Sequence, residues 1–68
     1  MNYQYVDAYL EIKFPSGNIR RIKKSIIEQI SQIENNGKPY VRIDIRGNYY
    51  NFNGTFEDLE KNSKTVFI

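Results

Sequence analysis

The sequence predicts an α+β fold, in which residues 1–68 form a small single domain with the order β-β-α-β-β. Two stretches alternate between apolar and polar side chains, and each contains the residues of a tight turn. Between them, isoleucines recur at helical spacing. We therefore expect a mostly antiparallel sheet, one helix packed on one face of it, and a short C-terminal helical turn or strand.

The first predicted strand runs from Tyr3 to Phe14, where side chains alternate with the period of two that a half-buried strand requires. The inward set is Val6, Ala8, Leu10, Ile12 and Phe14, and the outward set is Tyr5, Asp7, Tyr9, Glu11 and Lys13.

A hairpin loop is predicted at Phe14-Pro15-Ser16-Gly17-Asn18. Proline suits the second position of a type I turn, and glycine supplies the left-handed residue that follows it in a three-residue loop. The returning strand, Asn18 to Lys23, then places Leu10 opposite Ile22 and Glu11 opposite Arg21.

A helix is predicted to begin at Ser25-Ile26-Ile27-Glu28, which has the pattern of a capping box. Its apolar stripe consists of Ile26, Ile27, Ile30 and Ile33. We expect Asn35-Asn36-Gly37 to provide a left-handed C-cap, with Pro39 preventing any continuation.

A second hairpin is predicted over residues 40–53, because Tyr40 to Arg46 alternates and Gly47-Asn48 is a two-residue turn signal. Counting from that turn, the expected pairs are Arg46 with Tyr49, Ile45 with Tyr50, Asp44 with Asn51, and Ile43 with Phe52.

The remaining residues predict a short helical turn and an apolar tail. Thr55 followed by Asp58 is an N-cap pattern, so Phe56 to Lys61 should be helical and close the core with Phe56 and Leu59. We expect the tail from Thr65 to Ile68 to pack or to pair.

Composition argues against an enzyme. The chain has no cysteine and no histidine, which removes the common nucleophile, the common base near neutral pH and the usual zinc ligands, and we expect no metal and no cofactor. Asp7 and Glu11 lie about 13 Å apart along one strand, too far to act together. The absence of disulfides, of a signal-peptide pattern and of a membrane span predicts a cytoplasmic protein.

The predicted outward face of the sheet is rich in tyrosine and arginine, the residues enriched at the energetic centres of protein interfaces. The residues proposed to bind a protein are Tyr5, Tyr9, Arg42, Arg46, Tyr49 and Asn51, with Asp44 and Asn53 on the same face. The alternative is that these tyrosines are simply good strand formers.

A basic cluster suggests a second reading, in which the chain binds nucleic acid through Lys13, Arg20, Arg21, Lys23 and Lys24. The competing interpretation is that these charges protect an edge strand from pairing with other chains. The acidic residues near the tyrosines favour a protein partner over a phosphate backbone.

The sequence therefore predicts a non-enzymatic protein-binding module, such as an inhibitor or adaptor. A bias toward residues with A/T-rich codons suggests a low-G+C bacterium or one of its phages or plasmids as the source, and the inhibitor or adaptor is expected to be encoded by a phage or other mobile element, as an anti-defence protein would be. A homodimer formed through an edge strand is a third possibility.

Overall fold

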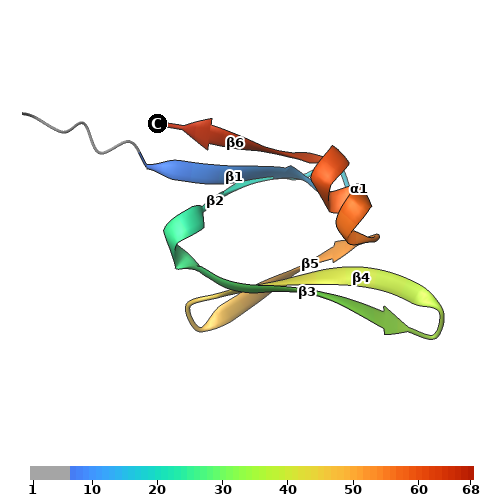
Figure 1. Cartoon of the computed structure of the whole chain (residues 1–68). Helices are drawn as coiled ribbons and strands as arrows, with labels where there is room; N and C mark the ends of the chain where they lie inside the picture. Colours follow the sequence, from blue (N-terminus) through green and yellow to red (C-terminus); the bar gives the residue numbers. More distant parts are fainter. Residues whose placement is uncertain (1–6) are drawn as a thin grey trace, which may run out of the picture.

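Six strands and two short helices make up the computed structural model, which describes residues 7–68 (Figure 1). The elements are β1 (Ala8–Lys13), β2 (Ile19–Lys23), the 3-10 helix η1 (Lys24–Ile26), β3 (Ile27–Asn35), β4 (Lys38–Ile45), β5 (Asn48–Asn53), α1 (Phe56–Lys61) and β6 (Ser63–Phe67). The strands form two three-stranded antiparallel sheets, with the orders β2-β1-β6 and β3-β4-β5. The expectation of one sheet with the order β-β-α-β-β is therefore wrong, whereas a small, mostly antiparallel domain is confirmed.

The first hairpin has the predicted register. Leu10 pairs with Ile22 and Glu11 with Arg21. The Gly17 N–H donates to the Phe14 carbonyl over 2.8 Å, and Gly17 has a φ of 97°, so the glycine occupies the left-handed position of a three-residue loop. The part of the predicted first strand that precedes Asp7 lies outside the described residues.

The predicted helix over residues 25–34 is wrong, because this segment forms η1 and then the nine-residue strand β3. Lys23, the residue before η1, makes no side-chain capping bond. Asn36 and Gly37, expected to cap a helix, have φ values of 54° and 75° and form the two-residue turn between β3 and β4. Two consecutive left-handed residues are what a type I′ hairpin requires, and β-branched isoleucines favour the strands that it joins.

A β-bulge explains why the isoleucines imitate a helix. Ile27 pairs with Ile45 and Gln29 pairs with Asp44, so Glu28 is an extra residue in β3. The extra residue returns Ile30, three positions after Ile27, to the inner face beside Ile43. Ile33 lies on the opposite face, so the apparent stripe is divided between the two sides of a strand.

The second hairpin forms, but its turn is one residue earlier than predicted. Arg46 and Gly47 form the turn, and the observed pairs are Ile45 with Asn48, Asp44 with Tyr49, Ile43 with Tyr50, Arg42 with Asn51 and Val41 with Phe52. Each residue of β4 therefore pairs with a β5 residue two positions earlier in the sequence than the predicted partner. Because side chains alternate with a period of two, the displacement leaves each side chain on the expected face.

The C-terminal elements agree with the sequence pattern. Asp58 N–H donates to Thr55 Oγ1, and the Asp58 carboxylate accepts from the Thr55 N–H, which completes a capping box for α1. Leu59 is buried, but the prediction that Phe56 closes the core is wrong, because its side chain is 47% exposed. The tail pairs as predicted, since β6 is antiparallel to β1.

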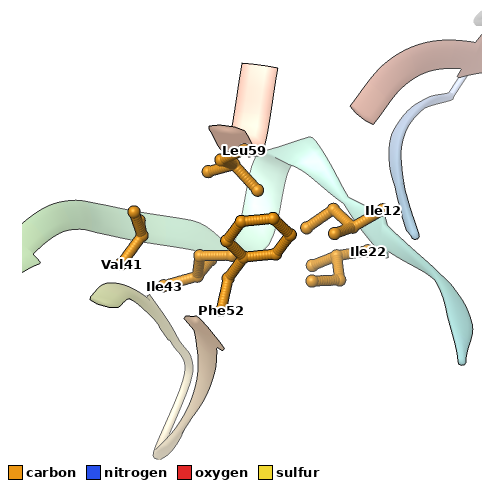
Figure 2. Close-up of a cluster of buried hydrophobic side chains, with 6 residues drawn as sticks. All are labelled: Ile12, Ile22, Val41, Ile43, Phe52 and Leu59. Atoms are coloured by element: carbon orange, nitrogen blue, oxygen red, sulfur yellow. The ribbon is translucent and has the colours of Figure 1, made fainter. Parts of the chain in front are cut away.

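The core lies between the inner faces of the two sheets. Its buried members are Ile12, Ile22, Val41, Ile43, Phe52 and Leu59. Figure 2 shows the Phe52 ring between the isoleucines of the first sheet and the β4 residues of the second, with Leu59 above it. Phe14 packs against Phe52 with 5.9 Å between ring centroids. One cluster therefore joins the inner faces of both sheets.

Candidate protein-binding face

The outer face of the second sheet presents nine side chains in three rows that cross β3, β4 and β5. We call this surface the grid face. Its rows are Gln29, Asp44 and Tyr49; Ser31, Arg42 and Asn51; and Ile33, Tyr40 and Asn53. The assignment follows from the burial of Val41 and Ile43, which places the alternate residues of β4 on the outside.

Arg42 stands at the centre of the grid face and is held from two sides. Its Nε donates to Asp44 Oδ1 over 2.7 Å. Its guanidinium carbon lies 4.2 Å from the centroid of the Tyr49 ring, within the range of a cation–π contact. Holding an arginine in one orientation before binding reduces the side-chain entropy that an interface would otherwise have to remove.

The ion pair also fixes the charge of this face. The hydrogen bond to Asp44 raises the pKa of Arg42 above its usual value, and the guanidinium, like any arginine side chain at ordinary pH, is positively charged. Asp44 balances that charge, and the other seven side chains of the grid face are uncharged. Because Nε is the atom that Asp44 uses, the two terminal Nη groups can still donate to a bound molecule.

Two shallow hollows adjoin opposite ends of the grid face. One is bordered by Glu28, Gln29, Arg42, Asp44, Ile45, Gly47, Asn48 and Tyr49. The other is bordered by Asn35, Asn36, Lys38, Pro39, Tyr40 and Asn53. The first is mainly polar, the second is about equally polar and apolar, and both are partly open, which suits side chains of a partner protein better than an enclosed small molecule.

The structure brings together only half of the residues predicted to bind a protein. Arg42, Tyr49 and Asn51 lie on the grid face. Tyr9 lies on the outer face of the first sheet, and Arg46 is exposed in the β4–β5 turn. Tyr5 lies outside the described residues. The single Tyr/Arg surface expected from the sequence is therefore two surfaces on separate sheets.

Sequence reasoning missed the β3 residues of the grid face, Gln29, Ser31 and Ile33, together with Tyr40. The first three belong to the segment that the sequence predicts as a helix. The Asn36-Gly37 dipeptide is the signal that could have placed them, since this pair is the strongest short-range indication of a β-hairpin.

The basic cluster is divided between the two faces of the first sheet. Arg21 and Lys23 lie on the outer face, where Arg21 Nε is 2.9 Å from Glu11 and Lys23 Nζ is 3.6 Å from Asp7. Arg20 lies on the inner face, with its guanidinium 5.7 Å from the Tyr50 centroid.

Two further basic residues complete the predicted set. Lys24 Nζ donates to Thr65 Oγ1 over 2.6 Å, and Lys13 is on the outer face. Four of the five cations therefore already have partners within the chain and do not form one continuous basic surface.

Residues 7–68 also lack two other features. This part of the chain has no group of three or more acidic side chains placed to hold a metal ion. Its helices are too short to cross a membrane. Comparison of the chain with protein-family models, curated proteins and solved structures finds no match.

Proposed function

We propose that this chain is a non-enzymatic protein-binding module, an inhibitor or adaptor, that contacts its partner through the grid face. The observation that carries the proposal is the orientation of Arg42 at the centre of that face, stacked on Tyr49 and bonded to Asp44. Arginine and tyrosine near the centre of a flat surface are the residue types that dominate binding energies at protein interfaces.

The charge of the grid face supports a protein partner over a nucleic acid. Arg42 and Asp44 offset each other, so the face has no excess of positive charge to attract phosphates. Tyr49, which could stack on a base, already has the Arg42 guanidinium against its ring. Peptide carbonyls and amides suit the remaining amide and hydroxyl side chains.

The test uses a photo-crosslinking amino acid at Asn51 in cells of the source organism, with nuclease in the lysate. Asn51 is exposed and adjoins Arg42, so we expect a specific protein adduct. The same probe at Arg21, on the outer face of the first sheet, is the positional control and should yield no such adduct.

The affinity of variants for the identified partner then tests whether Arg42 and Tyr49 contribute to binding. Arg42→Ala and Tyr49→Ala should each weaken binding about 30-fold, which corresponds to about 2 kcal/mol for an interface anchor. The matched controls are Arg21→Ala and Tyr9→Ala, an arginine and a tyrosine on the other outer face. Equal losses of affinity from the grid-face variants and from the control variants would refute the proposal. An adduct that disappears after nuclease treatment would refute it as well.

A further inference from the structure

Strand β6 is an edge of the first sheet, since the strand order is β2-β1-β6. Its side chains include no proline and one charge, on Lys64, which Glu11 balances at 3.5 Å. Phe67 is 66% exposed, and the neighbouring Ile68 is 67% exposed. An edge strand with these properties readily pairs with another strand.

The backbone hydrogen bonds show which groups of β6 are available. Ile68 N–H donates to the Asp7 carbonyl, and the Asn62 carbonyl accepts from Lys13 N–H. Even-numbered residues of this segment therefore direct their backbone groups toward β1. Because these groups alternate along an antiparallel strand, Ser63, Thr65 and Phe67 direct their N–H and C=O groups to the free edge.

We propose that β6 pairs with β6 of a second copy in an antiparallel arrangement, with the two-fold axis at Thr65. The pairs are then Thr65 with Thr65, Ser63 with Phe67, and Lys64 with Val66 of the other copy. Three of the five positions exchange two hydrogen bonds each, so about six bonds form. This register uses all five residues of β6 and gives one continuous six-stranded sheet.

The side chains are compatible with this self-pairing. Each Lys64 lies opposite a valine, so no like charges face each other directly. The two Thr65 side chains meet at the axis, where Thr–Thr pairs are favourable. Each Thr65 Oγ1 accepts from Lys24, so its own O–H can donate across the axis. Phe67 covers Ser63 at the end of α1 of the second copy.

The two edges of the first sheet, β2 and β6, differ in charge. Strand β2 contains Arg20, Arg21 and Lys23, and two copies paired along it would bring these cations together. Cationic side chains are a common protection of edge strands against pairing. Within the first sheet, self-pairing is therefore expected at β6 and not at β2.

The test compares proline substitutions on the two edges. By the same alternation, the Ile19 N–H faces the free edge of β2, as that of Thr65 faces the free edge of β6. Neither Thr65→Pro nor Ile19→Pro removes a hydrogen bond to β1. In sedimentation equilibrium from about 10 µM to 1 mM, we expect the wild type and Ile19→Pro to dimerise. Thr65→Pro should raise the dissociation constant at least tenfold.

Amide exchange of the unmodified chain provides a readout that does not depend on the folding of a variant. Raising the concentration should slow exchange at Ser63, Thr65 and Phe67 and leave Ile19, Arg21 and Lys23 unchanged. Purely monomeric sedimentation up to 1 mM, or a dimer without these three protections, would overturn the proposal. Protection produced only by an added extended peptide would instead identify β6 as a site for another protein.

This proposal is independent of the function of the grid face, which lies on the other sheet. Arg42→Ala should leave the dimer dissociation constant unchanged. Thr65→Pro should leave the affinity of a single chain for its partner unchanged, so failure of either proposal can be recognised separately.

Discussion

The outer faces of the two sheets each contain tyrosine, arginine and a carboxylate, but they use them differently. On the first sheet, Glu11 of the central strand contacts Arg21 of β2 and Lys64 of β6, so its ion pairs join all three strands. On the second sheet, Arg42 pairs with Asp44, two residues along the same strand. The second ion pair joins no strands.

Ion pairs between strands and an ion pair within one strand have different effects on the stability of a sheet. Cross-strand ion pairs contribute to holding a sheet together, although each adds little when exposed. The Arg42–Asp44 pair lies within one strand and does not itself join strands, although Arg42 also contacts the ring of Tyr49 on β5. The ion pairs of the first face therefore join its three strands, whereas the ion pair of the second face joins none.

The largest expected effect tests whether the two faces depend on one core. Phe52 is 1% exposed and contacts both sheets, so Phe52→Ala should destabilise the protein by about 3–5 kcal/mol. That loss is a large share of the roughly 3–10 kcal/mol of unfolding free energy expected for a chain of this size. Native-state amide exchange should show β1 and β4 losing protection together. Loss confined to one sheet would mean that the faces are independent units.

An intermediate effect is expected at the connection from the second sheet to the first. Thr55→Ala removes the side-chain cap of α1, and we expect a loss of about 1 kcal/mol in the free energy of unfolding by urea. Thr55→Ser keeps the hydroxyl and is the matched control. Because β6 directly follows α1, we expect the helix to hold β6 in place. A variant that frays α1 without loosening β6 would contradict this expectation.

The smallest effect distinguishes the two carboxylates. The hydrogen bond from Arg21, aided by Lys64, holds the pKa of Glu11 below its usual value of 4.5. A lowered pKa contributes stability above pH 4.5 that is lost as the pH falls through the folded-state value. Glu11→Gln should therefore lower the urea midpoint slightly at pH 7 and leave it unchanged at pH 2.

Asp44→Asn is the comparison, because its ion pair joins no strands. We expect its urea midpoint at pH 7 to stay within error of the wild type, while partner affinity falls. A larger stability loss from Asp44→Asn than from Glu11→Gln would reverse the distinction between the two faces.

Local turn chemistry made the first hairpin and α1 predictable. Pro15 and Gly17 determine a loop of defined length, and Thr55 with Asp58 determines a helix start. In these segments, the interactions that select the structure lie within a few residues, so the sequence shows them directly.

The segment from Ser25 to Asn35 was unpredictable from periodicity for a physical reason. The bulge at Glu28 shifts the phase of alternation, and the spacing of Ile27, Ile30 and Ile33 then matches a helix. The grid face was only half predicted as a result. Arg42, Tyr49 and Asn51 come from strands that alternate regularly, whereas Gln29, Ser31 and Ile33 come from the strand with the bulge.

The two short helices limit how the two sheets can move relative to each other, and they indicate where the chain can accept inserted residues. The chain passes between the sheets at η1 and again at α1, which stand at opposite ends of the structure in Figure 1. Because the two sheets are covalently connected at both ends, we expect relative sliding or separation of the sheets to be small. The β3–β4 turn at Asn36-Gly37 extends past α1 in Figure 1, and the β4–β5 turn at Arg46-Gly47 lies at the end where η1 stands. We therefore expect added loop residues there to remodel the rim of the grid face without disturbing how the layers meet.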